Sequence, residues 1–506
     1  MNFNAVAWLL GCVSLIIAAF LLVPAVIAFG YGESGGVSAF LLSALVSAAV
    51  GGLLVWWNRG SRLGPDGRPD YFRREGLAVV GLSWIVAGVL GALPYLFSGL
   101  VSSPIDAVFE AVSGFTTTGS TILPAEDIDL FHGSMKAVGF WRSFTHWLGG
   151  FGIVMVFVVL FPTGGRSLFR SEIPGIAREA GHKRVRDSAM TLLRIYVGLS
   201  VVECIALFLS GMSVFDATIH TFGTIATGGF SNYSDSVAHF ASFKAELIIG
   251  VFMFLAGINF AYYDIALRSG FKKGWLAVAS STEARVYVLL TFGSTFLIAT
   301  VLWFWGGSNG ELDSVLPDYR QYGQATRDSF FQVVCLVTST GFGTANFDAW
   351  PQVCRILLMM LAVIGACAGS TGGGMKVIRF IIVAKAALRG VRQFIRPRAI
   401  HDVRVDGVAL DDSVVSSITG YFALWVLIFI GGTVFLATFG IDLESASTAV
   451  VATLNNIGPG LGVVGPTMNF AEMPELVKVV LTVFMILGRL EFYAVVALFV
   501  PGFWRT

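Results

Sequence analysis

Long apolar runs alternate with short polar stretches along almost the whole chain. The runs lie near residues 5–29, 36–57, 76–98, 137–161, 190–211, 243–267, 284–306, 352–387, 414–439 and 475–500. About 20 apolar residues are enough for a helix to cross the hydrocarbon core of a bilayer. The pattern therefore predicts ten transmembrane spans, of which the eighth is long and interrupted.

Four shorter apolar runs lie between these spans, at 104–118, 214–227, 326–340 and 442–457. Runs of this kind are too short to cross a bilayer as helices, so we interpret them as re-entrant half-helices. After the first two spans, the order along the chain is span, half-helix, polar segment, span, and this order occurs four times.

Each short run ends in a polar segment that contains glycine, which we call a knot. The first to fourth knots are Thr116–Ser120, Ala226–Phe230, Thr338–Phe342 and Asn455–Pro459. When the knots are aligned on Gly119, Gly229, Gly341 and Gly458, they are 110, 112 and 117 residues apart. A repeat of this length is a whole supersecondary unit. Four unrelated loops would not share this spacing, so we predict four similar units whose knots surround one axis.

Three of the short runs carry an aspartate at the same place. Asp106, Asp216 and Asp328 each stand 13 positions before the glycine of their knot, and Ser445 takes this place in the fourth run. An aspartate at a helix start accepts hydrogen bonds from free N–H groups and favours the positive end of the helix dipole. We interpret these aspartates as capping residues.

The composition fits a membrane protein. The 506 residues are 55% hydrophobic and 13% charged, and the mean hydropathy is +0.77. Soluble domains carry about 25% charged residues, so the composition excludes a water-soluble globule. The five cysteines show no metal-binding spacing, and we interpret them as packing residues: Cys12, Cys204, Cys335, Cys354 and Cys367.

The charges of the loops predict an orientation. Lysine and arginine gather at 59–74, 166–186, 268–285 and 376–404, whereas the alternate loops are acidic, near 126–129, 235, 311–318, 442 and 472. Basic loops stay on the cytoplasmic side of a membrane. Both termini are then cytoplasmic, and each half-helix enters the bilayer from outside.

The knots have the chemistry of a cation path. A half-helix that enters from outside directs its C-terminal carbonyl groups, which carry partial negative charge, toward the middle of the membrane. Irregular backbone at that depth is tolerated where it lines a water-filled cavity. Glycine allows carbonyl groups to turn inward, and rings of oxygen atoms replace the hydration shell of an alkali cation. The sequence therefore predicts a cation pore.

These features resemble the bacterial Trk/Ktr potassium transport superfamily, and within it the Trk-type membrane subunit, over nearly the whole chain. The resemblance implies an all-α polytopic membrane protein. In this fold, four covalently joined span–pore-helix–span repeats surround a pseudo-four-fold pore, and two extra transmembrane helices precede them. The corresponding division is 1–65 for the N-terminal extension, then 66–187, 188–280, 281–405 and 406–506 for the pore repeats.

The resemblance also implies which residues form the potassium filter. They are Thr117, Thr118, Gly119, Thr227, Gly228, Gly229, Thr340, Gly341, Asn456, Ile457 and Gly458. Glycine in all four knots is similar to the potassium-preferring members. The fourth knot departs from the threonine-rich pattern but is similar to the fourth filter of the family, so we expect a filter without exact four-fold symmetry.

The eighth apolar run contains three successive glycines, Gly372 to Gly374. Glycine inside a helix costs about 1 kcal/mol relative to alanine, so we expect a broken helix and a loop beneath the third knot. The resemblance implies that this loop gates the pore, with Gly369, Ser370, Thr371, Gly372, Gly373, Gly374 and Lys376. The alternative is a close-packed helix contact. The stretch does not match a phosphate-binding loop, because Met375 precedes Lys376.

Arg489 lies in the last apolar run. A charge at membrane depth usually faces a cavity or a partner. The resemblance implies that Arg489 is an electrostatic barrier to cations and an anchor for the gating loop. An ion pair, with Glu491 for example, is the alternative. His146 is interpreted as a buried packing residue.

The function that the resemblance implies is potassium uptake across the bacterial inner membrane. It implies K⁺ as the transported ion, no organic cofactor, a homodimer, and a cytoplasmic nucleotide-binding regulatory protein of the RCK/KTN type. No nucleotide-binding motif occurs in this chain, and no nucleic acid partner is expected.

Two rival functions predict different sequence features. A proton- or sodium-coupled symporter with alternating access would be marked by inverted repeats, whereas these four repeats share one orientation. A membrane-embedded enzyme needs clustered catalytic residues within the bilayer, and the apolar runs contain none. We therefore expect a transporter rather than an enzyme.

Overall fold

Helices make up most of the structure, a computed structural model. It describes residues 1–58, 73–152, 182–308, 319–398 and 401–490, together with 492, 496, 498 and 500–504. In these residues the only strands are β1 (Arg404–Val405) and β2 (Val408–Ala409), which pair antiparallel. The chain is therefore nearly all helical, as the apolar pattern predicts.

Six described helices are long and apolar enough to cross a membrane. They are α1 (Phe3–Tyr31), α2 (Ser34–Trp57), α3 (Arg73–Phe97), α9 (His182–Leu209), α14 (Thr282–Ser308) and α18 (Asp412–Ala437). Each coincides with a predicted span. The side chains of Phe296 and Phe304 on α14 are 67% and 70% exposed, which suits contact with lipid rather than with water.

Two other predicted spans are broken: the prediction of an uninterrupted helix is wrong for 243–267, whereas the predicted interruption of 352–387 is confirmed. The run 243–267 divides into α11 (Phe243–Ala256) and α12 (Phe260–Ser269), which meet at 88°, and α13 (Phe271–Ser280) follows. The run 352–387 divides into α16 (Gln352–Ile364) and α17 (Val377–Ile395). The two breaks satisfy each other's backbone groups, since Cys367 N donates to Gly257 O at 3.1 Å and Phe260 N donates to Gly369 O at 3.0 Å.

The remaining two predicted spans are only partly described. The first begins as α6 (Lys136–Trp147) and continues as a π-helix, η3 (Leu148–Gly152), and the rest of that prediction lies outside the described residues. The last begins as α20 (Glu475–Leu490), beyond which only scattered residues are described. A π-helix widens the helical turn and frequently occurs at functional sites.

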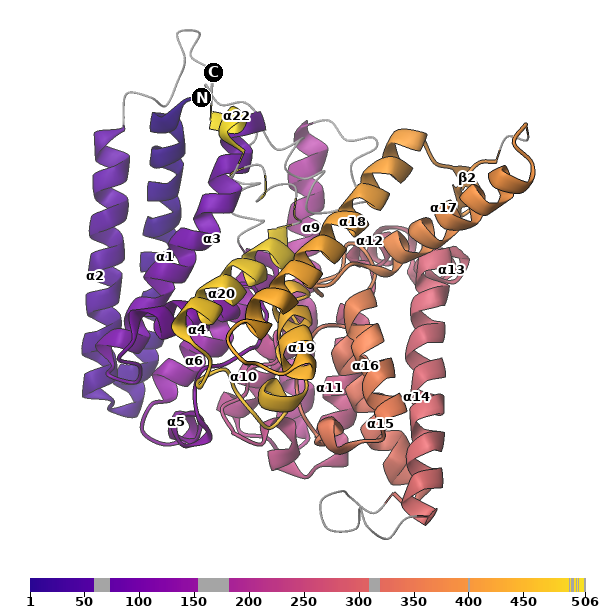
Figure 1. Cartoon of the computed structure of the whole chain (residues 1–506). Coiled ribbons are helices and arrows are strands. Elements are labelled where there is room, and N and C mark those ends of the chain that lie inside the picture. The colour runs from indigo at the N-terminus through magenta and orange to yellow at the C-terminus, as the bar shows by residue number, and fades with distance from the viewer. Residues whose placement is uncertain are drawn as a thin grey trace.

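The four predicted half-helices are present. They are α4 (Pro104–Phe115), α10 (Val214–Ile225), α15 (Tyr322–Val337) and α19 (Leu443–Leu454), and α15 begins four residues before the predicted run. The four lie in the half of the molecule away from the two termini (Figure 1). The other short helices are α5 (Ala125–Ile128), η2 (Asp129–His132), η4 (Ser236–Phe240), η5 (Phe347–Ala349), η6 (Gly462–Val464) and α22 (Pro501–Trp504).

The interpretation of the three aspartates as caps is wrong. Ser103 and Ser213 are the N-cap residues of α4 and α10, and their hydroxyl groups accept from Asp106 N and Asp216 N. Asp328 lies inside α15, where it accepts hydrogen bonds from Gln324. A serine that precedes the helix competes for the same free N–H groups, so the aspartate three residues later is free to bind elsewhere.

The half-helices pack in a closed cycle. Each contacts the helices before and after it in the chain: α4 contacts α3 and α6, α10 contacts α9 and α11, α15 contacts α14 and α16, and α19 contacts α18 and α20. Each also contacts the main helix that follows the preceding half-helix in the cycle: α10 contacts α6, α15 contacts α11, α19 contacts α16, and α4 contacts α20. The last of these contacts brings the end of the chain back to its beginning.

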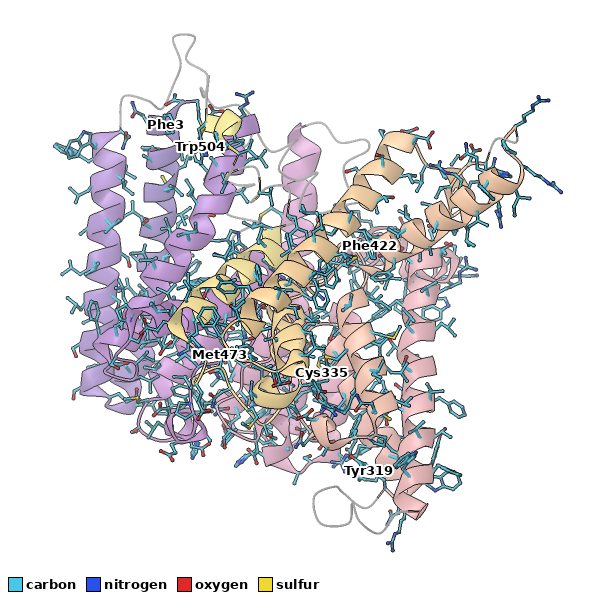
Figure 2. All side chains as sticks on the ribbon, viewed as in Figure 1. Phe3, Tyr319, Cys335, Phe422, Met473 and Trp504 are labelled. Atoms are coloured by element: carbon cyan, nitrogen blue, oxygen red, sulfur yellow. The ribbon has the colours of Figure 1, made fainter. Side chains whose placement is uncertain are left out.

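The α1–α2 hairpin stands outside this cycle, against α3 and α6 (Figure 1). The two termini lie at the same end of the molecule, where the rings of Phe3 and Trp504 stack with their centres 6.1 Å apart (Figure 2). The cycle of short helices, rather than the N-terminal hairpin, therefore positions the candidate site.

Candidate functional site

The four knots share one backbone conformation. The residue two positions before the glycine has a positive φ in every knot: 54° at Thr117, 55° at Thr227, 56° at Ser339 and 53° at Asn456. The glycines themselves have φ values of 81°, 81°, 88° and 99° for Gly119, Gly229, Gly341 and Gly458. Residues other than glycine rarely adopt a positive φ, so its recurrence at one offset shows a common local structure.

The knots are also joined to their half-helices in the same way. In each, an N–H group donates to the carbonyl five residues earlier: Thr118 to Ser113 at 2.9 Å, and Gly228 to Gly223, Thr340 to Cys335 and Ile457 to Ala452 at 2.8 Å. These bonds continue the half-helix for one wider turn and reverse the chain direction. The matched spacing of the knots therefore reflects a matched conformation.

The four glycines and the carbonyls before them close a ring. A side-chain carbon at Gly119 would lie 2.2 Å from Gly228 O, at Gly229 2.0 Å from Thr340 O, at Gly341 2.3 Å from Ile457 O, and at Gly458 3.0 Å from Thr118 O. The contacts thus run from each knot to the next and from the fourth back to the first. No side chain fits between neighbouring knots, and the positive φ excludes one independently.

A cavity of about 110 Å³ opens onto one side of this ring. It is lined by all four glycines and by polar groups of the segments that follow them, among them Ser120, Thr121, Ser231 and Thr467. We call this cavity the vestibule. Ions or water in it would meet the four knots at one place.

A buried ion pair beside the vestibule joins the segments that directly follow the first and second knots. Arg142 Nε lies 2.6 Å from Glu110 Oε1, and the two side chains are 3% and 0% exposed. Glu110 also accepts from Thr121 Oγ1 and Ile122 N, at 3.0 Å each, and Arg142 Nη1 donates to Ser231 O at 2.8 Å. A buried charge pair is tolerated when further hydrogen bonds satisfy its remaining atoms, as they do here. The sequence reasoning did not assign this pair.

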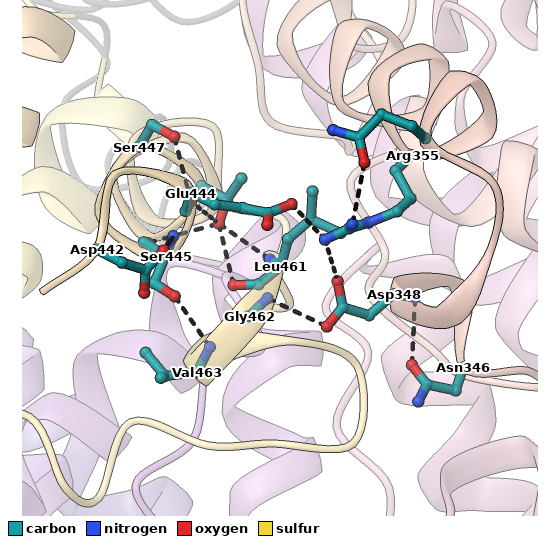
Figure 3. A network of polar contacts seen from close by, with 12 residues as sticks. Asn346, Asp348, Arg355, Asp442, Glu444, Ser445, Ser447, Leu461, Gly462 and Val463 are labelled. Carbon is teal, nitrogen blue, oxygen red and sulfur yellow. Dashed lines mark hydrogen bonds and ion pairs between the residues drawn. The ribbon is translucent and has the colours of Figure 1, made fainter. Parts of the chain in front are cut away.

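Three further cationic side chains form ion pairs between the other helices of the cycle. Arg327 binds Glu246 at 2.6 Å, and Lys478 Nζ lies 2.7 Å from Asp106 Oδ1. Arg355 binds both Asp348, at 2.7 Å, and Glu444, while Asp348 Oδ2 accepts from Gly462 N at 3.2 Å (Figure 3). These contacts link α11 to α15, α20 to α4, and α16 to α19. Together with Arg142, one cationic side chain therefore lies at each of the four contacts between successive half-helices and their neighbours in the cycle.

His146 supports the second knot, so it has a larger role than packing. Its side chain is fully buried, Phe230 N donates to Nε2 at 3.3 Å, and Nδ1 lies 2.7 Å from Gly114 O. Because Nε2 accepts, Nδ1 carries the proton and donates to the carbonyl. The imidazole therefore joins α4 to the second knot.

A loop of residues 365–376 replaces the middle of the eighth run and lies on the side of the ring opposite the vestibule. Gly373 N donates to Ser339 Oγ at 2.6 Å. Side-chain carbons at Gly372 and Gly373 would lie 2.8 Å from Thr338 O and 2.3 Å from Asn455 O. The expectation of a broken helix beneath the third knot is confirmed, and a continuous close-packed helix is excluded.

The loop is held mainly through backbone groups. Ala368 N donates to Glu283 Oε1 at 2.6 Å, and Thr371 N donates to Ala256 O at 3.4 Å. Lys376 Nζ donates to Gly372 O within the loop, and Lys376 has a φ of 75°. A lysine with positive φ is uncommon and marks a position that the surrounding structure determines.

Arg489 joins this loop to the π-helix. Its guanidinium group donates to Thr371 O at 3.0 Å, to Gly149 O at 3.0 Å and to Gly150 O at 3.2 Å. Both partners lie outside regular α-helix, and the arginine therefore adds hydrogen bonds between them. The alternative partner, Glu491, lies outside the described residues.

The fold and this site define a helical membrane protein in which four similar backbone segments meet at one centre. The family model of the TrkH cation transport proteins matches residues 38–505, and the chain belongs to this family. It is 36% identical to the Trk system potassium uptake protein TrkH of Escherichia coli K12 over 100% of both chains. It is 30% identical to TrkG of the same organism, over 96% of this chain and 95% of the relative.

A solved structure agrees. The crystal structure of the potassium transporter TrkH from Vibrio parahaemolyticus superposes with a TM-score of 0.85 over 100% of each chain, at 32% identity. The resemblance to the Trk-type membrane subunit is therefore confirmed.

Proposed function

We propose that this protein takes up potassium through a channel-like pore along the axis of the glycine ring. The observation that carries this proposal is the closed cycle of contacts between each knot glycine and the carbonyl of the next knot. Backbone oxygens arranged in rings replace the hydration shell of K⁺. The relatives with this arrangement are named potassium uptake proteins.

The architecture behind this pore is four span–pore-helix–span repeats around a pseudo-four-fold axis. The repeats are 66–187, 188–280, 281–405 and 406–506, and residues 1–65 form the two-helix extension. The cyclic packing of α4, α10, α15 and α19 supports this division. The C-terminal ends of the four pore helices converge on the ring, and their partial negative charge favours a cation there.

The filter is formed by the residues before and at each glycine. Thr117, Thr118 and Gly119 contribute in the first knot, and Thr227, Gly228 and Gly229 in the second. Thr340 and Gly341 contribute in the third knot, and Asn456, Ile457 and Gly458 in the fourth. Their support is the shared backbone conformation. Asn456 donates through Nδ2 to Thr118 Oγ1 at 2.9 Å, which makes the fourth knot different from the others.

The gate consists of the loop 365–376 and Arg489. The loop lies against the third and fourth knots on the side away from the vestibule, and Arg489 holds it through Thr371 O. A guanidinium charge beneath the filter opposes the passage of a cation. Opening requires the loop residues Gly369 to Gly374 and Lys376 to leave this position.

The transporter is a homodimer in the bacterial inner membrane, with both termini in the cytoplasm. Its regulatory partner is a cytoplasmic nucleotide-binding protein of the RCK/KTN type. The support for the regulatory partner is the basic end of α17. Arg392 and the C-cap residue Arg396 lie there beside Phe394, whose side chain is 89% exposed. The two termini also lie at one end of the molecule (Figure 1).

The experiment that tests the pore is potassium uptake in a transport-deficient strain. Gly119→Ser and Gly341→Ser are expected to reduce uptake at least about tenfold, because a ring contact has no room for a side chain. Gly52→Ser is the matched control, since a side chain at Gly52 meets nothing within 4 Å. Wild-type uptake by both ring variants, or a purified wild type that never conducts K⁺ with its regulator present, would end the proposal.

A proton- or sodium-coupled symporter is the second candidate. Its support is the pair of broken helices, α11–α12 and α16–α17, because discontinuous helices are common in secondary transporters. Electrical recording separates the two candidates. Currents far above about 1000 ions per second favour a pore, because a carrier whose conformational cycle takes about a millisecond or longer cannot exceed that rate.

A further inference from the structure

The first and third knots are attached to a polar side chain of their own pore helix, six residues before the glycine. In the first, Ser113 Oγ donates to Ser120 O at 2.6 Å. In the third, Cys335 Sγ donates to Phe342 O at 3.0 Å and accepts from Gly341 N at 3.1 Å. Both side chains bind the carbonyl that follows the ring glycine, so the two attachments are equivalent.

The second and fourth knots have no polar side chain in this place, which is taken by Gly223 and Ala452. Neighbouring segments attach them instead. Phe230 N of the second knot donates to His146 Nε2, and Gly458 O of the fourth accepts from Ser120 Oγ at 2.9 Å. The contacts run in the order first, second, third, fourth, so the two self-attached knots lie across the ring from each other.

We propose that Ser113 and Cys335 are positioning residues that set how well the pore distinguishes potassium from the smaller sodium ion, an inference that rests on the proposed function. Holding Gly341 N stops the preceding peptide group from rotating its oxygen, Thr340 O, away from the axis. Holding Ser120 O or Phe342 O on the pore helix fixes the chain just after the ring glycine. Ion sites discriminate only while their oxygens stay within about 0.5 Å of the required geometry. Cys335 holds two backbone groups of its knot, whereas Ser113 holds one, so Cys335 has the larger effect.

This role corrects the interpretation of Cys335 as a packing residue. A thiol is a weak donor and a weak acceptor, and its hydrogen bonds matter where water does not compete. Cys335 is fully buried, and its sulfur lies between the pore helix and the knot. The low dielectric of such a site strengthens a hydrogen bond and makes its loss more costly.

The test uses the full-length chain and compares potassium with sodium uptake in a transport-deficient strain. Cys335→Ala removes both hydrogen bonds and is expected to lower the ratio of potassium to sodium uptake about fivefold, the effect of one typical hydrogen bond. Cys335→Ser keeps a donor and an acceptor and is expected to stay within about twofold of wild type. Ser113→Ala is expected to lower the ratio by a smaller factor.

The control is Cys354→Ala, because Cys354 is a buried cysteine on α16 rather than on a pore helix. It is expected to leave the ratio unchanged. An unchanged ratio in Cys335→Ala, or an equal loss in the alanine and serine variants, would overturn the inference. If Cys335→Ala does not reach the membrane, Ser113→Ala against Ser113→Cys decides in the same way. A wild type that takes up no potassium contradicts the proposed function instead.

Discussion

The two sides of the glycine ring are built from different interactions. On the vestibule side, charged side chains join segments far apart in the chain: Lys478 pairs with Asp106, and Arg142, which pairs with Glu110, donates to Ser231 O. On the opposite side, the loop 365–376 touches the knots through glycines and backbone groups, and Arg489 donates to carbonyl groups. Charged pairs with several bonds resist displacement, whereas a glycine loop held by single bonds leaves its position at lower cost. The comparison indicates a rigid vestibule side and a movable opposite side.

The largest effect is expected from the vestibule side. Arg142→Ala leaves Glu110 buried without its cation, and breaking a buried pair in this way costs about 3–5 kcal/mol. We expect a large loss of thermal stability in detergent, measured by the apparent melting temperature. Arg268→Ala is the control, since its pair with Asp264 is 54% and 26% exposed and such pairs contribute about 0–1 kcal/mol. Equal losses in the two variants would contradict a rigid vestibule side.

On the opposite side, Arg489→Ala is expected to change gating rather than folding. The variant removes the bonds to Thr371 O, Gly149 O and Gly150 O. Hydrogen bonds to charged groups contribute about 1.5–3 kcal/mol, enough to change the open fraction about tenfold or more. Single-channel or flux recordings should show a higher open probability with the ratio of potassium to sodium unchanged. Wild-type flux and open probability would remove Arg489 from the gate.

A smaller effect in the same direction is expected for Gly373→Ala. A side-chain carbon there would lie 2.3 Å from Asn455 O, so the loop must move away from the fourth knot. We expect a several-fold rise in basal flux, measured without the regulator. Gly390→Ala is the comparison, because a side chain at Gly390 on α17 meets nothing within 4 Å. If basal flux falls in Gly373→Ala, the loop does not block the path where we place it.

The smallest effect concerns the start of the fourth pore helix, where Asp442 is the N-cap of α19. The Ser445 side chain and backbone N–H hold the pKa of Asp442 below its usual range. Its stabilisation is therefore present above the pKa of the unfolded chain, about 3.9, and is lost as the pH falls through the lower folded value. Melting temperature against pH should decline below about pH 4 in wild type and less in Asp442→Asn, which keeps the cap. Identical profiles would contradict this assignment.

How far the sequence predicts the site depends on the kind of interaction. The knots and their glycines were found from spacing, because a backbone conformation with positive φ needs glycine at one offset in every repeat. The break beneath the third knot was found because Gly372 to Gly374 weaken a helix locally. By contrast, Cys335 and Ser113 were not recognised, since a single serine or cysteine in an apolar run has no distinguishing local pattern. Glu110 and Lys478 show in the sequence only as charges in apolar segments.

The sequence alone determined the properties that depend on near neighbours in the chain. These are the apolar helices, the four short apolar helices, the four repeated knots with Gly119, Gly229, Gly341 and Gly458, and the interrupted eighth run. Only the tertiary structure decided which knot follows which around the ring and which carbonyls Arg489 binds. It also decided which lysine or arginine side chain forms the ion pair at each contact between neighbouring helices of the cycle. The physical reason is range: helix formation and φ are set within a few residues, whereas a pair such as Asp106 and Lys478, 372 positions apart, forms only after the whole chain has closed its cycle.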